Sequence, residues 1–194
     1  MKLILFVILL LSSLVSAQEA NNYIRIDGVI SANAGYYPLG VGFALGRQSL
    51  HDKFFYKIEG SIGYTPKYET GNGTTYRGVG EFRIRRNNLL IGGGVTSSYL
   101  ATSAWSKGAV RPKVGVGFLT NISDVPSRIF IDYVHNGTDT TNHVRGLDMR
   151  LEMPMNEKWG VLFAVTPFSY HPTNRPELGR SWAITETLGI SFRF

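Results

Sequence analysis

The sequence predicts an all-β chain that closes into a transmembrane, antiparallel, up-and-down β-barrel. Apolar residues alternate with polar or small ones through most of the 194 residues, whereas helical periodicity is almost absent. The alternating segments are about ten residues long, which suits membrane-barrel strands, because strands of soluble domains usually have about five or six residues. Short connections alternate with long ones, which is typical of barrels with turns at one end and loops at the other.

The N-terminus has the features of a secretory signal peptide. Lys2 supplies a positive charge, an apolar run follows, and the run ends in a small-residue cleavage site before Gln18. The run is too short to span a bilayer, and no later stretch is apolar enough for a transmembrane helix. We therefore expect residues 1–17 to be removed during export and residues 18–194 to form a single barrel domain.

The composition excludes several classes of exported protein. The chain has no Cys, so neither a disulfide nor a lipid-modified cysteine is expected. The formal net charge is +6, and a basic balance can indicate binding to nucleic acid or to anionic lipid. An exported chain with no Lys/Arg run longer than Arg85-Arg86 is not expected to bind nucleic acid.

Ten segments show the two-residue alternation, and each is expected to form one strand. In chain order they are residues 22–31, 36–47, 53–64, 75–86, 88–99, 109–120, 127–135, 144–153, 158–169 and 182–194. An even count places both termini at the short-turn end, which we expect to be periplasmic. Eight strands are the alternative, if the first segment is periplasmic or if two segments are extensions of loops.

Each of the first four segments combines an apolar face with a face of small or charged residues. Paired charges such as Lys57 and Glu59 lie on the second face, where they suit a narrow lumen better than a water-exposed surface. The apolar faces carry Ile24, Ile26 and Ile30; Tyr37, Leu39, Val41, Phe43 and Leu45; Tyr56, Ile58, Ile62 and Tyr64; and Tyr76, Phe82 and Ile84.

The last six segments continue the pattern. Gly92-Gly93-Gly94, within residues 88–99, indicates a bend or a close approach of two backbones. Arg145 and Glu186 fall on apolar faces, and we expect both near the outer interface, where a charge costs about 0–1 kcal/mol. The apolar faces of the last five segments carry Val110, Pro112, Val114, Val116 and Phe118; Ile129, Ile131 and Tyr133; Leu147, Met149 and Leu151; Trp159, Val161, Phe163, Val165 and Pro167; and Ile184, Leu188, Ile190, Phe192 and Phe194.

The connections and the aromatic residues predict how the barrel lies in a membrane. Short turns are expected at residues 47–52, 85–88, 121–127 and 154–157, and long loops at residues 65–74, 101–108, 136–143 and 171–181. Aromatic rings prefer the two membrane interfaces. We expect one interface to be marked by Tyr64, Tyr76, Tyr170 and Trp182, and the other by Phe54, Phe55, Phe118, Trp159, Phe192 and Phe194.

The inward faces carry charges of both signs, which we expect to form an ion-pair network that fills the lumen. Buried charges pair because an unpaired one is costly. A barrel of eight to ten strands has little room once such side chains fill it, so we expect no wide pore; a narrow small-solute channel is an alternative. The candidate lumen residues are Arg77, Glu81, Arg83, Arg111, Lys113, Asp132, Asp148, Arg150, Glu152 and Arg193.

The C-terminal strand carries a specific pattern, in which Leu188, Ile190, Phe192 and Phe194 alternate with polar or small residues. This pattern resembles the C-terminal sorting signal of Gram-negative outer-membrane proteins, which the barrel-assembly machinery recognises. The mature chain also resembles the small outer-membrane barrels of the OmpA/OmpX type. The resemblance implies a location in the bacterial outer membrane, contact with its lipid and lipopolysaccharide, and a structural or surface-interaction role. We expect a monomer.

An enzymatic alternative rests on the segment DYVHNGTD, residues 132–139, which loosely resembles the strand that carries the His of outer-membrane lipid A deacylases. The resemblance would make His135 a catalytic residue of an acyl ester hydrolase on the lipid-facing side. That motif needs a Ser where this chain has Gly137, and it needs a carboxylate to orient the His. Asp148 and Glu152, on the next segment, are expected to face inward. We therefore favour a barrel without enzymatic activity.

No cofactor and no metal are expected. Four residues with imidazole or carboxylate side chains, the groups that transition metals prefer, fall on the expected outer side. They are His135, Asp139, His143 and His171. Because they lack the short spacing of a metal-binding motif, the default interpretation is solvated loop residues.

Overall fold

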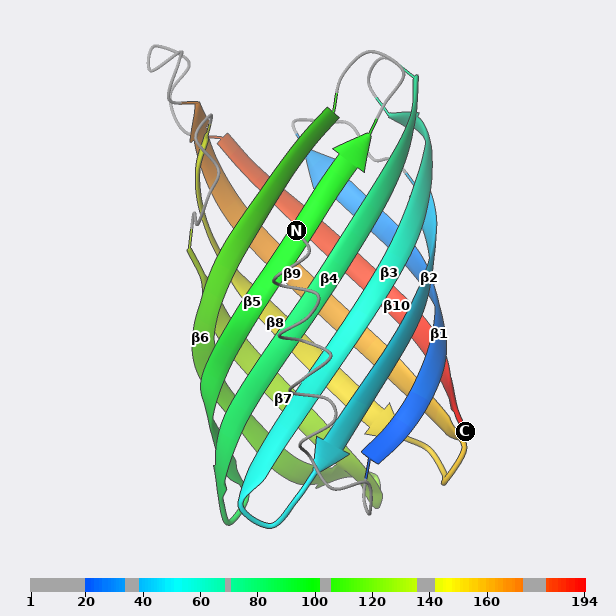
Figure 1. The fold of residues 1–194 in the computed structure, drawn as a ribbon, viewed down its shortest axis with the longest axis vertical. Coiled ribbons are helices and arrows are strands. Elements are labelled where there is room, and N and C mark those ends of the chain that lie inside the picture. Colours follow the sequence, from blue (N-terminus) through cyan, green and yellow to red (C-terminus); the bar gives the residue numbers. More distant parts are fainter. Residues whose placement is uncertain (1–19, 34–38, 69–70, 102–105, 136–141, 173–180) are drawn as a thin grey trace, which may run out of the picture.

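The chain forms one closed ring of antiparallel strands in the computed structural model (Figure 1). The structure describes residues 20–33, 39–68, 71–101, 106–135, 142–172 and 181–194. The strands are β1 (Ala20–Asn33), β2 (Leu39–Leu50), β3 (Phe54–Tyr68), β4 (Gly71–Arg86), β5 (Leu89–Ala101), β6 (Ser106–Ile122), β7 (Val125–Val134), β8 (Asn142–Pro154), β9 (Trp159–Pro172) and β10 (Ser181–Arg193). In the described residues, no helix is long and apolar enough to cross a membrane.

Closure of the barrel depends on the pairing of β1 with β10. Ile26 of β1 lies opposite Ile190 of β10 on one side and opposite Phe43 of β2 on the other. The prediction of ten strands is confirmed, and the eight-strand alternative is wrong, because the first segment pairs along both of its edges. The expected signal peptide, residues 1–17, lies outside the described residues.

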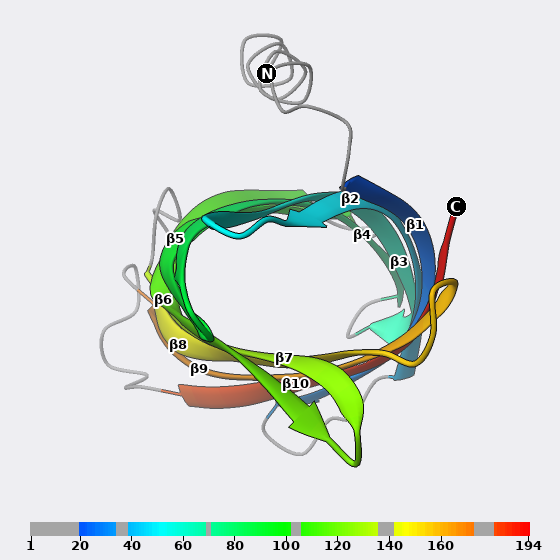
Figure 2. The ribbon, with the colours of Figure 1, turned by 90° about the horizontal axis from the view of Figure 1, so that it is seen from below.

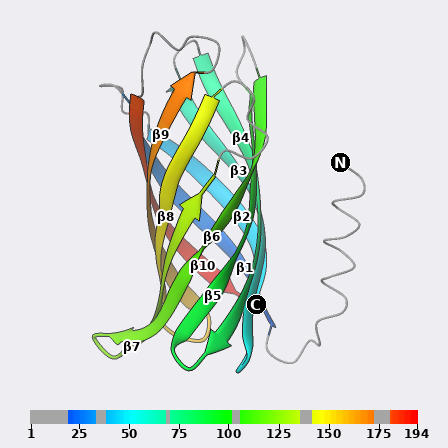
Figure 3. The same cartoon turned by 90° about the vertical axis from the view of Figure 1, so that its left-hand side faces the viewer.

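Strand boundaries differ from the predicted ones at both ends of the barrel, and β3 and β4 extend furthest, to Tyr68 and from Gly71, into the predicted long loop at residues 65–74. β2 continues past the predicted end at residue 47, because its pairing with β3 extends to Leu50 opposite Phe55. The turn predicted at residues 121–127 is much shorter, since β6 ends at Ile122 and β7 begins at Val125. Ser123 and Asp124 have φ angles of 49° and 65°, which suit a tight hairpin turn. The β6–β7 hairpin consequently extends past the rim of the barrel (Figure 2 and Figure 3).

The outer face of the barrel is apolar, as the alternation predicts. Ile26 is 67% exposed, Val41 is 63% exposed and Leu188 is 60% exposed. The inner face, by contrast, holds the buried charged residues of the chain. This distribution is the reverse of the one in a water-soluble barrel, and it is typical of barrels that face lipid.

Two charged residues share the outer face with the apolar ones. Arg145 and Glu186 are both exposed. Arg145 lies near the long-loop end of β8, and Glu186 lies opposite Ile30 of β1 and Val165 of β9. Both point outward, as the alternation predicts. Glu186 lies in the middle part of β10, so its expected place near the outer interface stays a prediction.

A small apolar cluster occupies the lumen near the short-turn end. Phe55, Leu90 and Phe130 are fully buried, and the centroids of the Phe55 and Phe130 rings are 5.3 Å apart. The prediction that Phe55 belongs to the outer aromatic girdle is wrong. Phe55 lies two positions from the buried Lys57, and residues two apart on a strand share one face.

Inward-facing glycines provide space for the large side chains of neighbouring strands. A Cβ at Gly189 would overlap a carboxylate oxygen of Asp27. The predicted close backbone approach in the triple glycine is confirmed, because a Cβ at Gly94 would overlap the carbonyl oxygen of Gly80 on β4. The inner face is therefore rich in glycine because the lumen contains large side chains from neighbouring strands.

Candidate functional site in the lumen

The first group of ion pairs joins β1 to β3. The Nε atom of Arg25 is 2.6 Å from Oδ1 of Asp27, and its Nη1 atom is 2.5 Å from Oε2 of Glu59. The Tyr23 hydroxyl donates a hydrogen bond to the same Glu59 oxygen. All four residues are buried. Because β2 lies between β1 and β3, these contacts run inside the ring past the glycines of β2.

The second group joins β4 to β6, β7 and β8. The Glu81 carboxylate accepts hydrogen bonds from Lys113 Nζ and from Arg150 Nη2, the second over 2.7 Å. Arg83 Nη2 is 2.6 Å from Oδ2 of Asp132. The side chains of Glu81, Arg83 and Asp132 have no exposed surface. A buried charge needs partners of this kind, because leaving one unpaired is strongly destabilising.

Lys57 extends the first group across the lumen to β8. Its Nζ atom is 3.3 Å from Oε2 of Glu59 on the same strand and 3.0 Å from Oε1 of Glu152 on β8. β3 and β8 are directly opposite in the ring of strands. Arg128 Nη2 lies 3.2 Å from the other Glu152 oxygen. The lumen is thus bridged from wall to wall by an ion pair.

The network is balanced in charge and stacked on the apolar cluster. The guanidinium carbons of Arg83 and Arg150 each lie 4.8 Å from the centroid of the Phe130 ring, and that of Arg128 lies 5.7 Å from the Phe55 centroid. Such cation–π contacts hold guanidinium groups in place where water is excluded. The acidic members are Asp27, Glu59, Glu81, Asp132, Asp148 and Glu152, and the basic members are Arg25, Lys57, Arg83, Lys113, Arg128 and Arg150.

The structure places the predicted lumen residues in two settings. Arg77 shares the inward register of Glu81 but is exposed, Arg193 is half-buried at the short-turn mouth, and Arg111 donates a hydrogen bond to the Ser98 hydroxyl over 3.1 Å. The network itself contains Glu81, Arg83, Lys113, Asp132, Asp148, Arg150 and Glu152.

Some members of the network are not among the candidate lumen residues. The signal was present in the alternation, because Arg25 and Asp27 flank the outward Ile26 and therefore share the inward face. Lys57 and Glu59 were predicted on the lumen face as a charge pair, and the members that the prediction did not name are Tyr23, Arg25, Asp27 and Arg128.

The residues of the C-terminal pattern face outward from β10. Leu188, Ile190, Phe192 and Phe194 are all exposed, and Phe192 packs edge-on against Trp159 with 5.0 Å between ring centroids. The strand that carries the pattern is one of the two that close the barrel. Recognition by the barrel-assembly machinery stays a prediction.

His135 lies at the end of β7 on the outer face, with its ring 6.5 Å from that of Tyr133. Asp148 and Glu152 of β8 are buried inside the lumen, on the other side of the wall. The side chains that β8 presents outward near His135 are Arg145 and Leu147, so β8 gives the imidazole no carboxylate. Gly137 and Thr138 lie outside the described residues.

Most of the outer-side metal candidates have side chains outside the described residues. In the part of the chain that the structure describes, no three His, Cys, Asp or Glu side chains gather around a common point. Asp139 lies outside the described residues, as do the side chains of His143, Tyr170 and His171.

The chain has similar solved structures but no matching family model. No protein-family model and no curated protein sequence matches the chain. Neisserial surface protein A is 6% identical, with 90% of this chain and 97% of that chain covered and a TM-score of 0.40. Ail, the attachment invasion locus protein of Yersinia pestis, is 14% identical, with 91% of this chain and 98% of that chain covered and a TM-score of 0.35. The N-terminal β-barrel domain of Pseudomonas aeruginosa OprF is 14% identical, with 91% of this chain and 100% of that chain covered and a TM-score of 0.37. These neighbours are small outer-membrane β-barrels. At such low identities and TM-scores, no role of theirs is transferred to this chain.

Proposed function

We propose that the chain is an outer-membrane β-barrel with a closed lumen, which has a structural or surface-interaction role and does not conduct solutes. The observation that carries the proposal is the inverted polarity of the wall, with ion pairs inside and large apolar side chains outside. A contiguous apolar surface of this kind is far larger than a monomer tolerates in water, and hydrocarbon suits it. The closed ring leaves no unpaired strand edge, which a bilayer requires.

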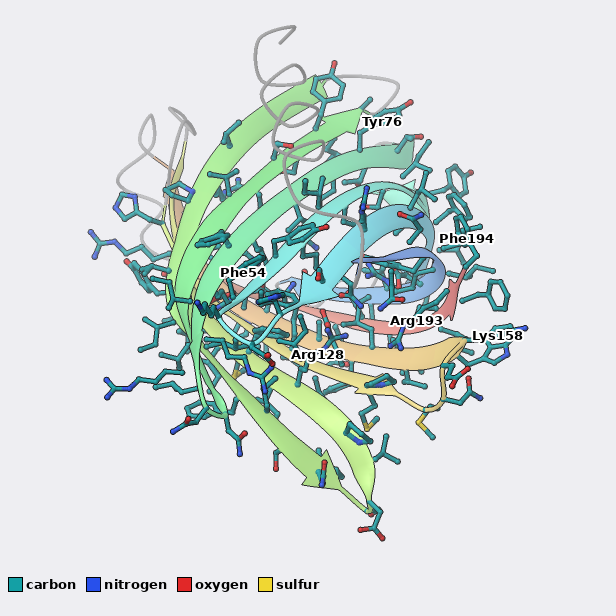
Figure 4. All side chains as sticks on the ribbon, turned by 60° about the horizontal axis from the view of Figure 1, so that its bottom comes forward. Phe54, Tyr76, Arg128, Lys158, Arg193 and Phe194 are labelled. Carbon is teal, nitrogen blue, oxygen red and sulfur yellow. The ribbon has the colours of Figure 1, made fainter. Side chains whose placement is uncertain are left out.

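Aromatic residues at two levels support this placement. Tyr64, Tyr76 and Trp182 are exposed near the long-loop end, and Trp159 and Phe194 are exposed near the short-turn end. Rings with polar edges prefer the level of the lipid headgroups. Phe194 points away from the wall at the short-turn mouth (Figure 4), as a residue in contact with lipid would.

Two contacts across the ring support the closed lumen. The ion pair between Lys57 and Glu152 joins opposite strands. Phe55 of β3 meets Phe130 of β7, again across the lumen. A solute would have to break both contacts, so the narrow-channel alternative receives no support from this arrangement.

The test combines gel mobility with conductance of the refolded chain in planar bilayers. We expect unboiled and boiled samples to migrate differently, as membrane barrels do, and we expect no stepwise conductance from the native chain. The variant that combines Lys57→Ala, Glu152→Ala, Phe55→Ala and Phe130→Ala removes both contacts without changing the net charge, and it should open transiently. Absence of a mobility shift would overturn the membrane barrel, whereas native conductance equal to that of this variant would overturn the closed lumen.

A further inference from the structure

An open cavity of about 900 Å³ lies inside the short-turn mouth, below the ion-pair network. Turn and strand-end residues from around the ring line it, so the cavity opens toward the side of the short turns. Its neutral polar lining is formed by Asn21, Gln48, Asn88, Thr120, Asn121 and Ser127. A cavity of this size and polarity can hold a small hydrated ligand.

Three arginines from three strands converge on this cavity: Arg85 of β4, Arg128 of β7 and Arg193 of β10. Among the described residues that line it, Asp52 is the only carboxylate. Asp52 is 95% exposed and lies 3.8 Å from Arg85, so water screens most of its charge. The cavity therefore has an excess of positive charge.

Arg128 and Arg193 also line a recess of about 20 Å³ directly above the cavity, next to Glu152. Glu152 is already shared between Lys57 and Arg128. The Arg193 Nη2 atom lies 3.4 Å from the position of a Cβ on Gly160, so its guanidinium rests against the wall of β9. In the part of the chain that the structure describes, Arg193 forms no ion pair. The network is balanced without it.

We propose that this cavity binds a soluble phosphate-type oxyanion through Arg193 and Arg128. Guanidinium groups present planar pairs of donors that match phosphate oxygens, and the neutral amides and hydroxyls of the lining can complete the coordination. A soluble anion fits better than a lipid headgroup, because both arginines lie inside the mouth whereas lipid meets the outer wall. Figure 4 shows Arg128 and Arg193 within the opening and Lys158 on its outer rim. This inference goes beyond the proposed structural role and does not depend on the closed lumen.

The test is calorimetric titration of the refolded chain with sodium pyrophosphate in uncharged detergent at low ionic strength. We expect saturable binding that becomes about tenfold weaker in Arg193→Gln, the loss typical of one charge-assisted contact. The matched control is Lys158→Gln, which removes the same charge from an exposed residue at the same end. It should bind as the native chain does.

Several results would overturn the proposal. They are no saturable binding by the native chain, equal weakening in Arg193→Gln and Lys158→Gln, and binding of phosphatidylglycerol micelles in place of pyrophosphate. Heat-dependent gel mobility checks that each variant is folded. If Arg193→Gln does not fold, Arg193→Lys replaces it in the test, because lysine keeps the positive charge but lacks the planar guanidinium group. Unchanged affinity in that variant would also contradict the assignment.

Discussion

Substitution of Glu81 by Gln tests the lumen network at a carboxylate that pairs with three cations. The Glu81 side chain has no exposed surface, and it contacts Lys113 Nζ, Arg150 Nη2 at 2.7 Å and Arg83 Nη2 at 3.4 Å. The amide has the same size, but it removes the negative charge and can turn N–H donors toward cations that are themselves donors. Breaking a buried ion-pair group by removing one partner costs about 3–5 kcal/mol. We expect a loss of this size in the free energy of unfolding.

The assay is urea unfolding of the refolded barrel in detergent micelles, followed by tryptophan fluorescence. Asp52→Asn makes the same chemical change at a carboxylate that is 95% exposed and 3.8 Å from Arg85. Exposed pairs contribute little, so this control should unfold at the native midpoint. If Glu81→Gln unfolded at the same midpoint as Asp52→Asn, the lumen network would contribute no stability, and the reasoning would be refuted.

Three further outcomes are expected. Gly189→Leu should lower the yield of heat-modifiable barrel, because the new side chain would overlap Asp27. The control Gly80→Leu, on the outer face, should assemble normally. Equal yields of the two variants would contradict the role of the inner glycines. Deletion of Phe194 should reduce the folded fraction in cells, measured by gel mobility, but should leave the folded fraction after refolding in detergent unchanged. An equal loss of folded protein in cells and in detergent would mean that Phe194 contributes to stability and not to sorting. Expression of the native chain, and of His135→Ala, should leave the mass spectrum of lipid A unchanged. If the native chain removed an acyl chain from lipid A and His135→Ala did not, the protein would be a deacylase.

The alternation in the sequence is sufficient to identify the strands and to assign each residue to a face. Glu81, Arg83 and Asp132 could be placed in the lumen because a strand has a period of two, and that period does not depend on the rest of the fold. The partners of these residues could not be predicted. Lys57 and Glu152 meet although they are 95 positions apart in the chain, because their strands are opposite in a ring of ten. That contact depends on the strand count and on every register around the ring.

The errors at the short-turn end have a related cause. Phe54 and Phe55 are adjacent aromatic residues, and composition alone assigns both to the membrane interface. Their side chains point to opposite faces, and only Phe54 is outside. Asn121, Ser123 and Pro126 are residue types typical of loops, so composition does not show how short the β6–β7 turn is. Left-handed backbone at Ser123 and Asp124 closes a tight turn there, and this conformation cannot be read from residue types alone.

The inner glycines and the inner charges are two aspects of one packing arrangement. The Tyr23 ring lies against Gly46 of β2, and the Asp27 carboxylate lies against Gly189 of β10, so the large side chains of β1 occupy the space that both neighbouring strands leave free. The same relation holds across β6 and β7, where the Phe130 ring lies against Gly117. Because each large side chain is matched to a small neighbour, removing one of them leaves a local gap and not a continuous path. A pore would require the loss of several members at different levels, so we look for the biological activity of this barrel at its two mouths and on its outer surface.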